Sequence, residues 1–260
     1  MKKLKIRKQH KTLFYVVLLF FLLACSNSNE EQGCTEVCES GFALNEETCS
    51  CEPIPCTLTC ADDEVLNEED CECEQFIPNV IEVDATDVSL TEDWKMKTAI
   101  TGFTGDGYIV WEGASQTWKG TIGEVGKLTY KVDIPKAGTY LFQWRSYIAK
   151  KADTDPWAEH NDSWLKLLDA DEFFAIRGTS KIYPKGSGKT PNPAGENGNG
   201  FFKVYMNTVD EWSRSTNTSD NNAHQIYATF NEAKEYTVII AARSNYHAID
   251  SFKLIEQNEQ

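Results

Sequence analysis

Apolar and polar residues alternate in two runs between residues 128 and 145. Residues 128–134 read Leu-Thr-Tyr-Lys-Val-Asp-Ile, and residues 139–145 read Thr-Tyr-Leu-Phe-Gln-Trp-Arg. A period of two places one set of side chains in a core and the other in water, as in a half-buried β-strand. Pro135 and Gly138 lie between the runs and favour a turn. The pattern predicts a hairpin whose aromatic face is covered by a second sheet.

Further short apolar segments are separated by Gly, Asn, Asp and Pro, which are typical turn formers. We expect strands at Val80–Ala85, Gly107–Trp111, Leu128–Ile134, Thr139–Ile148, Ser163–Leu168, Gly200–Val204, His224–Phe230, Glu235–Arg243 and Ile249–Ile255. Phe173–Ile176 is expected as a helical turn, and Lys185–Gly200 as a mobile or lid-like loop. The predicted fold class is all-β, an antiparallel sandwich over residues 80–256.

The first 24 residues have the pattern of an export signal. Six basic residues precede an unbroken run of twelve apolar residues, Leu13–Ala24, which is too short to span a bilayer. The run ends Leu-Leu-Ala before Cys25 and resembles a bacterial lipobox, which implies acylation of Cys25. The alternative is an ordinary signal peptide with an incidental cysteine.

Residues 25–33 form a polar tether. Its Glu30-Glu31 pair resembles the surface-export signal of Bacteroidetes lipoproteins. An exported outer-membrane lipoprotein at the cell surface is therefore expected, held to the membrane through its lipid alone.

Residues 34–76 contain two 22-residue repeats with the spacing C-x3-C-x10-C-x-C. Their cysteines are Cys34, Cys38, Cys49, Cys51, Cys56, Cys60, Cys71 and Cys73. Zinc binding would favour paired C-x2-C knuckles, which are absent, whereas export favours disulfides. Each repeat allows three pairings, and we favour first-to-third with second-to-fourth.

The segment before Cys49 and Cys51 resembles the latter half of an epidermal-growth-factor-like module. Each repeat is too small for a hydrophobic core, so disulfides would stabilise it. Residues 26–80 hold fifteen acids and no Lys or Arg. A protease-resistant, self-repelling stalk is favoured, with a protein-binding module as the alternative.

The whole chain has a formal net charge of −15. Without the basic first 24 residues the balance is 19 basic against 40 acidic residues, which gives −21. Nucleic-acid binding requires a basic footprint, so a nucleic-acid partner is excluded. The same charge argues against an electrostatic attachment to anionic lipid.

Four segments carry a further resemblance, in this order along the chain: Ile81–Ala85, Gly102–Ile109, Val132–Arg145 and Ala248–Leu254. Together they resemble the jelly-roll carbohydrate-binding modules of families six and thirty-five. The resemblance covers residues 80–256 and implies a galactose-binding-like jelly roll that binds sugar.

The resemblance also implies a structural calcium ion between the first and last strands. Glu82 and Asp84 lie on one face of the first strand, and Asp250 lies on the last. Calcium prefers such oxygen ligands. The alternative is a set of solvated carboxylates on an acidic protein.

Two aromatic walls and an asparagine bind sugar in these families. The turn aromatic corresponds to Tyr108 and the second wall to Trp212, and Ala248 stands where the asparagine is expected. The neighbouring Asn245, Tyr246 and His247 are candidate replacements for its polar contact. A buried core role is the alternative for Tyr108 and Trp212.

A second candidate cluster lies in the loop Thr154–Trp164. Trp157, His160 and Asp162 would contact a sugar there, with Arg145 or Arg243 giving forked hydrogen bonds. The alternative is an Asx-type turn at Asn161 and Asp162, with Trp164 in the core.

These features favour a non-catalytic, surface-anchored protein that binds a polysaccharide or oligosaccharide. An adhesin or assembly subunit with a protein partner, reached through the Cys-rich stalk, is one alternative. A jelly-roll polysaccharide lyase or glycosidase is the other, although no catalytic motif matches.

Overall fold

The computed structural model describes residues 34–39, 41–114, 120–150, 152–196 and 198–258. The predicted signal peptide, the acylated Cys25 and the tether to residue 33 lie outside the described residues. Within the described ranges, no helix has the length and apolar character needed to cross a membrane. The chain divides into two compact units, residues 1–56 and 57–260.

The first Cys-rich repeat is a hairpin of β1 (Phe42–Asn45) and β2 (Ser50–Pro53). Its disulfides join Cys34 to Cys49 and Cys38 to Cys51, which confirms the favoured pairing. Asn45 fixes the turn, because its side-chain oxygen accepts hydrogen bonds from two backbone N–H groups and its amide donates to Glu52 (2.7 Å).

The second repeat is built in the same way from β3 (Glu64–Asn67) and β4 (Glu72–Gln75). Cys60 pairs with Cys73, again second-to-fourth, and Cys56 and Cys71 are also disulfide-bonded. Asn67 repeats the role of Asn45: it caps its turn and donates to Glu74 (2.7 Å). The repeated Leu-Asn-Glu-Glu sequence thus encodes a repeated turn.

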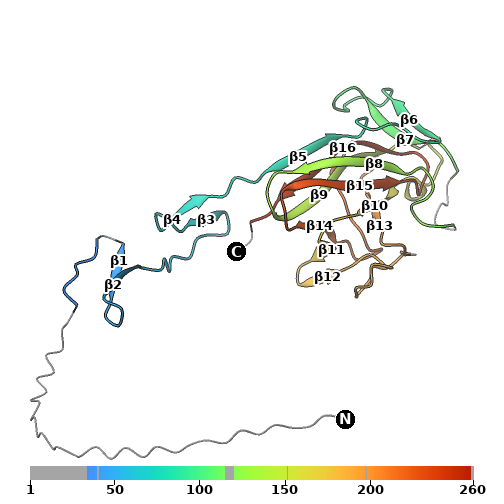
Figure 1. The fold of residues 1–260 in the computed structure, drawn as a ribbon. Helices are drawn as coiled ribbons and strands as arrows, with labels where there is room; N and C mark the ends of the chain where they lie inside the picture. The colour runs from blue at the N-terminus through green and yellow to red at the C-terminus, as the bar shows by residue number, and fades with distance from the viewer. Residues whose placement is uncertain (1–33, 40, 115–119, 151, 197, 259–260) are drawn as a thin grey trace, which may run out of the picture. The chain divides into compact units, whose positions relative to one another are not determined.

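Residues 80–256 form an antiparallel sandwich of two sheets (Figure 1). The strands are β5 (Val80–Asp84), β6 (Trp94–Lys97), β7 (Tyr108–Trp111), β8 (Leu128–Ile134), β9 (Gly138–Ile148), β10 (Asp162–Leu167), β11 (Glu172–Arg177), β12 (Ser180–Ile182), β13 (Phe202–Tyr205), β14 (Gln225–Phe230), β15 (Lys234–Ala241) and β16 (His247–Glu256). The smaller sheet has the order β13-β10-β15-β8. The larger has the order β12-β11-β14-β9-β16-β7-β6, with β5 on β16.

The predicted all-β jelly-roll sandwich, preceded by a small disulfide-rich region, is therefore confirmed. All nine expected strands are present within about two residues of their expected ends. Strands β6, β11 and β12 were not expected. The helical turn predicted at Phe173–Ile176 is wrong, because these residues belong to β11, where Phe173 faces the core and Phe174 the opposite side.

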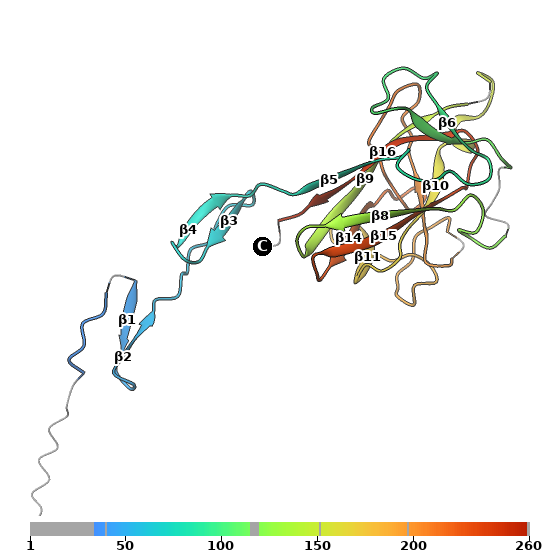
Figure 2. The same ribbon diagram turned by 45° about the horizontal axis from the view of Figure 1, so that its top comes forward.

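The predicted hairpin between β8 and β9 is also wrong. β8 pairs with β15 in the smaller sheet, whereas β9 pairs with β14 and β16 in the larger sheet, so the turn between them crosses from one layer to the other (Figure 2). The alternating pattern itself holds, since every second residue of Leu128–Ile134 is buried. The two apolar faces meet across the core instead of lying side by side in one sheet.

Aromatic side chains fill the space between the sheets. Phe252 of β16 packs against Tyr130 of β8 (ring centroids 5.2 Å apart) and Phe142 of β9 (5.6 Å). All three belong to one buried cluster that joins both layers. Burial of this apolar surface is the main stabilising contribution to such a fold.

The loop predicted to be mobile or lid-like, Lys185–Gly200, is tied to the sandwich. Its ends are joined by a hydrogen bond from the Gly200 N–H to the Lys185 carbonyl oxygen (2.9 Å). The Asn199 amide donates to the Ile122 carbonyl oxygen (2.6 Å), and the Ala194 N–H donates to the Ser219 hydroxyl (3.2 Å). The last two bonds tie the loop to two other parts of the chain, which argues against a lid.

We expect Phe252→Ala to lower the free energy of unfolding by about 3–5 kcal/mol, because the change leaves a cavity between the sheets. Chemical denaturation of the purified chain measures this change. Leu168→Ala is the matched control: Leu168 is 54% exposed, so its removal should change stability by no more than about 0.5 kcal/mol. Equal effects of the two substitutions would contradict this description of the core.

Candidate functional site

The predicted pair of sugar-binding walls, Tyr108 and Trp212, packs together. The two rings lie edge to face with centroids 5.2 Å apart, and Tyr108 is only 3% exposed. Trp212 also contacts Tyr147 (5.4 Å) and donates from its indole N–H to the Thr101 carbonyl oxygen (3.0 Å). No space remains for a sugar ring between the two side chains, so the predicted sandwich of the ligand by this pair is wrong.

Tyr108 nevertheless contributes to a cavity of about 520 Å³, here called the tyrosine pocket. Tyr147 and Tyr246 supply further aromatic surface. The remaining lining residues are Lys97, Ala99, Ile100, Val110, Glu112, Ile148, Ala149, Lys150, Asp153 and Asp210. Tyr246 has a positive φ of 60° and is held there by a hydrogen bond from its N–H to the Trp111 carbonyl oxygen (2.8 Å).

A larger cleft of about 910 Å³, here called the Trp157 cleft, lies beside the predicted loop. Trp157 begins the 3₁₀ turn η2 (Trp157–Glu159) and is 39% exposed. The other lining residues are Ala158, Glu159, Asn161, Asp162, Arg177, Lys203, Tyr205, Asn207, Asp220, Asn221, Ala223, Arg243 and Ser244. An exposed indole thus borders a cleft whose lining is rich in charged and amide groups.

Two ion pairs fix part of the lining of the Trp157 cleft. Asp162, the first residue of β10, is buried and accepts hydrogen bonds from the Arg243 guanidinium and the Ser244 hydroxyl. The Arg243 guanidinium also lies over the Trp164 ring, 5.2 Å from its centroid. The buried Lys203 ammonium pairs with Asp220. The alternative of an Asx-type turn at Asn161 and Asp162 does not apply, because Asp162 binds across strands; Trp164 is buried as expected.

A buried carboxyl group, that of Glu196, is hydrogen-bonded to a residue of this lining. Glu196 accepts hydrogen bonds from the Lys203 N–H (2.9 Å), the Lys185 N–H (3.4 Å) and the Thr218 hydroxyl (3.1 Å). It therefore joins the loop 185–200 to β13 and to the segment before Asp220. Burial raises the pKa of Glu196 to about 7, against the opposing effect of these donors and of the Lys203 charge.

Two predicted clusters that are far apart in the sequence meet at one place. The His160 imidazole Nδ1 lies 2.8 Å from the Asn245 carbonyl oxygen, and its ring packs on Tyr246 (5.6 Å). His160 is 8% exposed, and its Nε2 lies 3.8 Å from Asp155. Glu159 and Asn161, which flank His160 in the sequence, line the Trp157 cleft, and Tyr246 lines the tyrosine pocket. His160 therefore connects the linings of the two cavities.

His247 is a core residue, which corrects its prediction as a ligand contact. Its imidazole is fully buried, packs on Trp144 (5.3 Å) and hydrogen-bonds through Nδ1 with the Ser163 hydroxyl (2.9 Å). Burial lowers the pKa of His247 to about 3, so the ring is neutral at physiological pH.

The Arg145 guanidinium is committed to the protein, which corrects its predicted role in forked hydrogen bonds to a ligand. It pairs with the buried Asp250 (2.5 Å) and donates to the Gly102 carbonyl oxygen (2.7 Å). Its predicted alternative, Arg243, does lie in a cleft.

The three acids expected to hold calcium do not converge. Glu82 binds Arg214 and Lys253, Asp84 binds its neighbour Thr86, and Asp250 binds Arg145 and Thr104. In the part of the chain that the structure describes, the one grouping of potential metal ligands is Cys60, Glu64 and Cys73, whose cysteines form a disulfide. The residues present therefore do not fit a calcium ion held by these three side chains.

Sequence reasoning missed Lys203, Asp220 and Arg177. Lys203 is the charged residue of an otherwise apolar strand, and Asp220 lies in a segment rich in Ser, Asn and Asp. Neither feature distinguishes a cleft residue from a solvated one. Their proximity arises only when β13 and the loop after it are placed together.

No protein-family model and no curated protein matches this chain. Solved structures similar to it include a family 35 carbohydrate-binding module from Clostridium thermocellum (14% identity, TM-score 0.36), with 68% of this chain and 97% of that one covered. Another is a family 35 module from Cellvibrio japonicus (14% identity, TM-score 0.37; 70% and 99% covered). A third is the GH26-CBM35 β-(1,4)-mannanase of Podospora anserina (16% identity, TM-score 0.41). That match covers 70% of this chain and 28% of the mannanase.

Glu196 leads to a pH prediction. Its raised pKa means that the folded chain holds this proton more tightly than the unfolded chain does. The free energy of unfolding should therefore fall as pH rises from about 4.5 to about 7, by roughly 3 kcal/mol from this group alone. Glu196→Gln should remove this component, so that the difference between the variant and the wild type grows with pH in that window.

Denaturant titrations across the pH range measure the difference. Glu159→Gln is the control, because Glu159 is exposed on the same cleft and should leave the pH dependence unchanged. Parallel curves for Glu196→Gln and the wild type would contradict the buried, protonated state.

Proposed function

We propose that this chain binds a carbohydrate in the Trp157 cleft and catalyses no reaction on it. The observation that carries the proposal is the exposed Trp157 at a cleft of about 910 Å³ whose lining is held by two ion pairs. Sugars stack their apolar C–H faces on aromatic rings and direct their hydroxyl groups to polar side chains. The cleft has the volume of a small-molecule site and offers both kinds of contact.

The ion pairs support binding rather than catalysis. The carboxylate of Asp162 is engaged by Arg243 and Ser244, and that of Asp220 by Lys203. These pairs hold their polar atoms in place before a ligand arrives, which lowers the entropy cost of recognition. A glycosidase would instead need one carboxyl group able to give a proton and a second able to act as base or nucleophile.

We also propose that Cys25 carries lipid and holds the protein at the outer membrane, facing outward. The support is the sequence alone: a basic segment, twelve apolar residues, and Leu-Leu-Ala directly before the cysteine. Cys25→Ser should move the protein from the membrane fraction to the soluble fraction of expressing bacteria. Unchanged fractionation would refute the lipid anchor and leave the sugar-binding proposal standing.

Trp157→Ala should weaken sugar binding about 30-fold, because loss of a central aromatic contact typically costs about 2 kcal/mol. A glycan array with the purified chain identifies the ligand, and titration calorimetry measures its affinity. Tyr147→Ala, on the tyrosine pocket, is the matched control and should leave the affinity unchanged.

The reverse result, with binding lost only in Tyr147→Ala, would move the sugar to the tyrosine pocket. A chain that binds no glycan on the array would overturn the carbohydrate proposal itself. Release of reducing ends or unsaturated products during the titration would overturn the absence of catalysis.

A further inference from the structure

Asp250 lies where two strands share one edge of β16. β7 pairs with Ala248 and Ile249, and β5 takes over at Ser251. On the opposite edge the register with β9 shifts between Ile249 and Ser251, so Asp250 sits at a bulge. Its side chain is 0% exposed.

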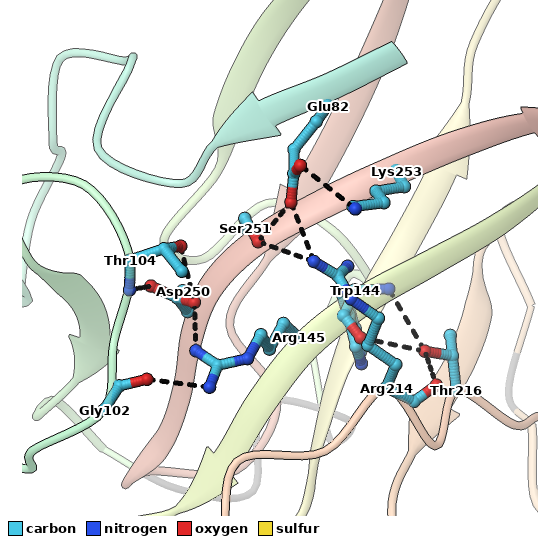
Figure 3. A network of polar contacts seen from close by, with 10 residues as sticks. All are labelled: Glu82, Gly102, Thr104, Trp144, Arg145, Arg214, Thr216, Asp250, Ser251 and Lys253. Carbon is cyan, nitrogen blue, oxygen red and sulfur yellow. Dashed lines mark hydrogen bonds and ion pairs between the residues drawn. The ribbon is translucent and has the colours of Figure 1, made fainter. Parts of the chain in front are cut away.

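A buried carboxylate is costly unless charge and hydrogen bonds compensate it. Thr104, in the loop that joins β6 to β7, donates to Asp250 from both its backbone N–H (2.8 Å) and its hydroxyl (2.9 Å). Arg145 of β9 supplies the opposite charge at 2.5 Å. Figure 3 shows the guanidinium between Asp250 and the carbonyl oxygen of Gly102, to which its second nitrogen donates (2.7 Å).

The groups around this guanidinium are those that a hard cation prefers. A carboxylate oxygen and a backbone carbonyl oxygen contact it, and the Thr104 hydroxyl lies on the same carboxylate. Calcium ions in proteins take their ligands from carboxylate and carbonyl oxygens. Arg145 therefore stands in a position whose chemistry suits a bound metal ion.

The neighbouring acid is neutralised in the same way. Glu82 of β5 accepts from Arg214 (2.7 Å) and pairs with Lys253 (3.1 Å) (Figure 3). Partial burial would raise the pKa of Glu82, but the hydrogen bonds and charges of Lys253 and Arg214 outweigh it and lower the pKa. Positively charged side chains of the protein are thus paired with two of the three acids predicted to hold calcium, Glu82 and Asp250.

We propose that Arg145 is the built-in cation of this strand junction. The junction needs no calcium ion, and shortening Arg145 converts it into a divalent-cation site formed by Asp250 and the Gly102 carbonyl oxygen. Arg145 also lies over the Trp212 ring, 5.2 Å from its centroid, so the same side chain ties the junction to the Tyr108–Trp212 pair. This proposal does not depend on the identity of any sugar ligand.

The test is the melting temperature of the purified full chain, measured in excess EDTA and in millimolar calcium chloride. The wild type should melt at the same temperature in both. Arg145→Ala should melt about 10 °C lower in EDTA, because it leaves a buried carboxylate unpaired. Calcium should restore about half of that loss, since an ion that binds only the folded state stabilises it.

Two further variants control for structural damage. Arg145→Lys keeps a positive charge but loses the two separate donor nitrogens of the guanidinium. This variant should melt between the wild type and Arg145→Ala without responding to calcium. Arg214→Ala removes one of the two cations on the half-exposed Glu82, and should lower the melting temperature only slightly, also without a calcium response.

A wild type that calcium stabilises, or that EDTA destabilises, would overturn the proposal even if Arg145→Ala cannot be purified. An Arg145→Ala protein that ignores calcium would overturn the conversion into a metal site. A calcium response in Arg214→Ala equal to that of Arg145→Ala would assign the ion to Glu82 and also overturn it.

Discussion

The charge of Asp250, buried where β5 and β7 meet on β16, is the constraint on which the arrangement of the large sheet depends. A carboxylate without access to water must find donors, and it finds them in two segments that are distant from it in sequence: the β6–β7 loop and β9. The loop that presents Gly102 and Thr104 is thereby fixed relative to β16. Because the same loop region accepts the Trp212 indole N–H at Thr101, the aromatic cluster beside the tyrosine pocket is fixed with it.

A contact between His160 and the segment before β16 connects the linings of the two cavities. His160 reaches the Asn245 carbonyl oxygen and packs edge to face against Tyr246, which joins the loop after β9 to the loop before β16. On one side of this contact are the rings of the tyrosine pocket and the Lys97–Glu112 ion pair. On the other are ion pairs anchored by Glu196 and Asp162, next to an exposed indole.

Strand positions could be predicted from the sequence because alternation is a local property, and β8 shows it at every residue. The sheet to which each strand belongs could not be predicted, since the same alternation occurs in a hairpin and in two strands that belong to different sheets. The Phe173-Phe174 pair hides its period because both faces of β11 are apolar. Among the site residues, Trp157 and Asp162 were found because Pro, charge and amides mark loops. The burial of Tyr108 and His247 and the pairing of Arg145 with Asp250 could not be predicted. Each depends on a partner that is distant in the sequence: Trp212, Ser163 and Asp250, respectively.

The disulfides of the first Cys-rich repeat all close within it, and Asn45 ties its own turn across the hairpin. Its fold therefore depends on no disulfide to the second repeat. Duplication or deletion of such a 22-residue module changes the length of chain ahead of the sandwich in whole steps and leaves every cysteine with its partner. Spacer length can thus evolve independently of the sandwich, by recombination between repeated segments instead of by gradual insertion.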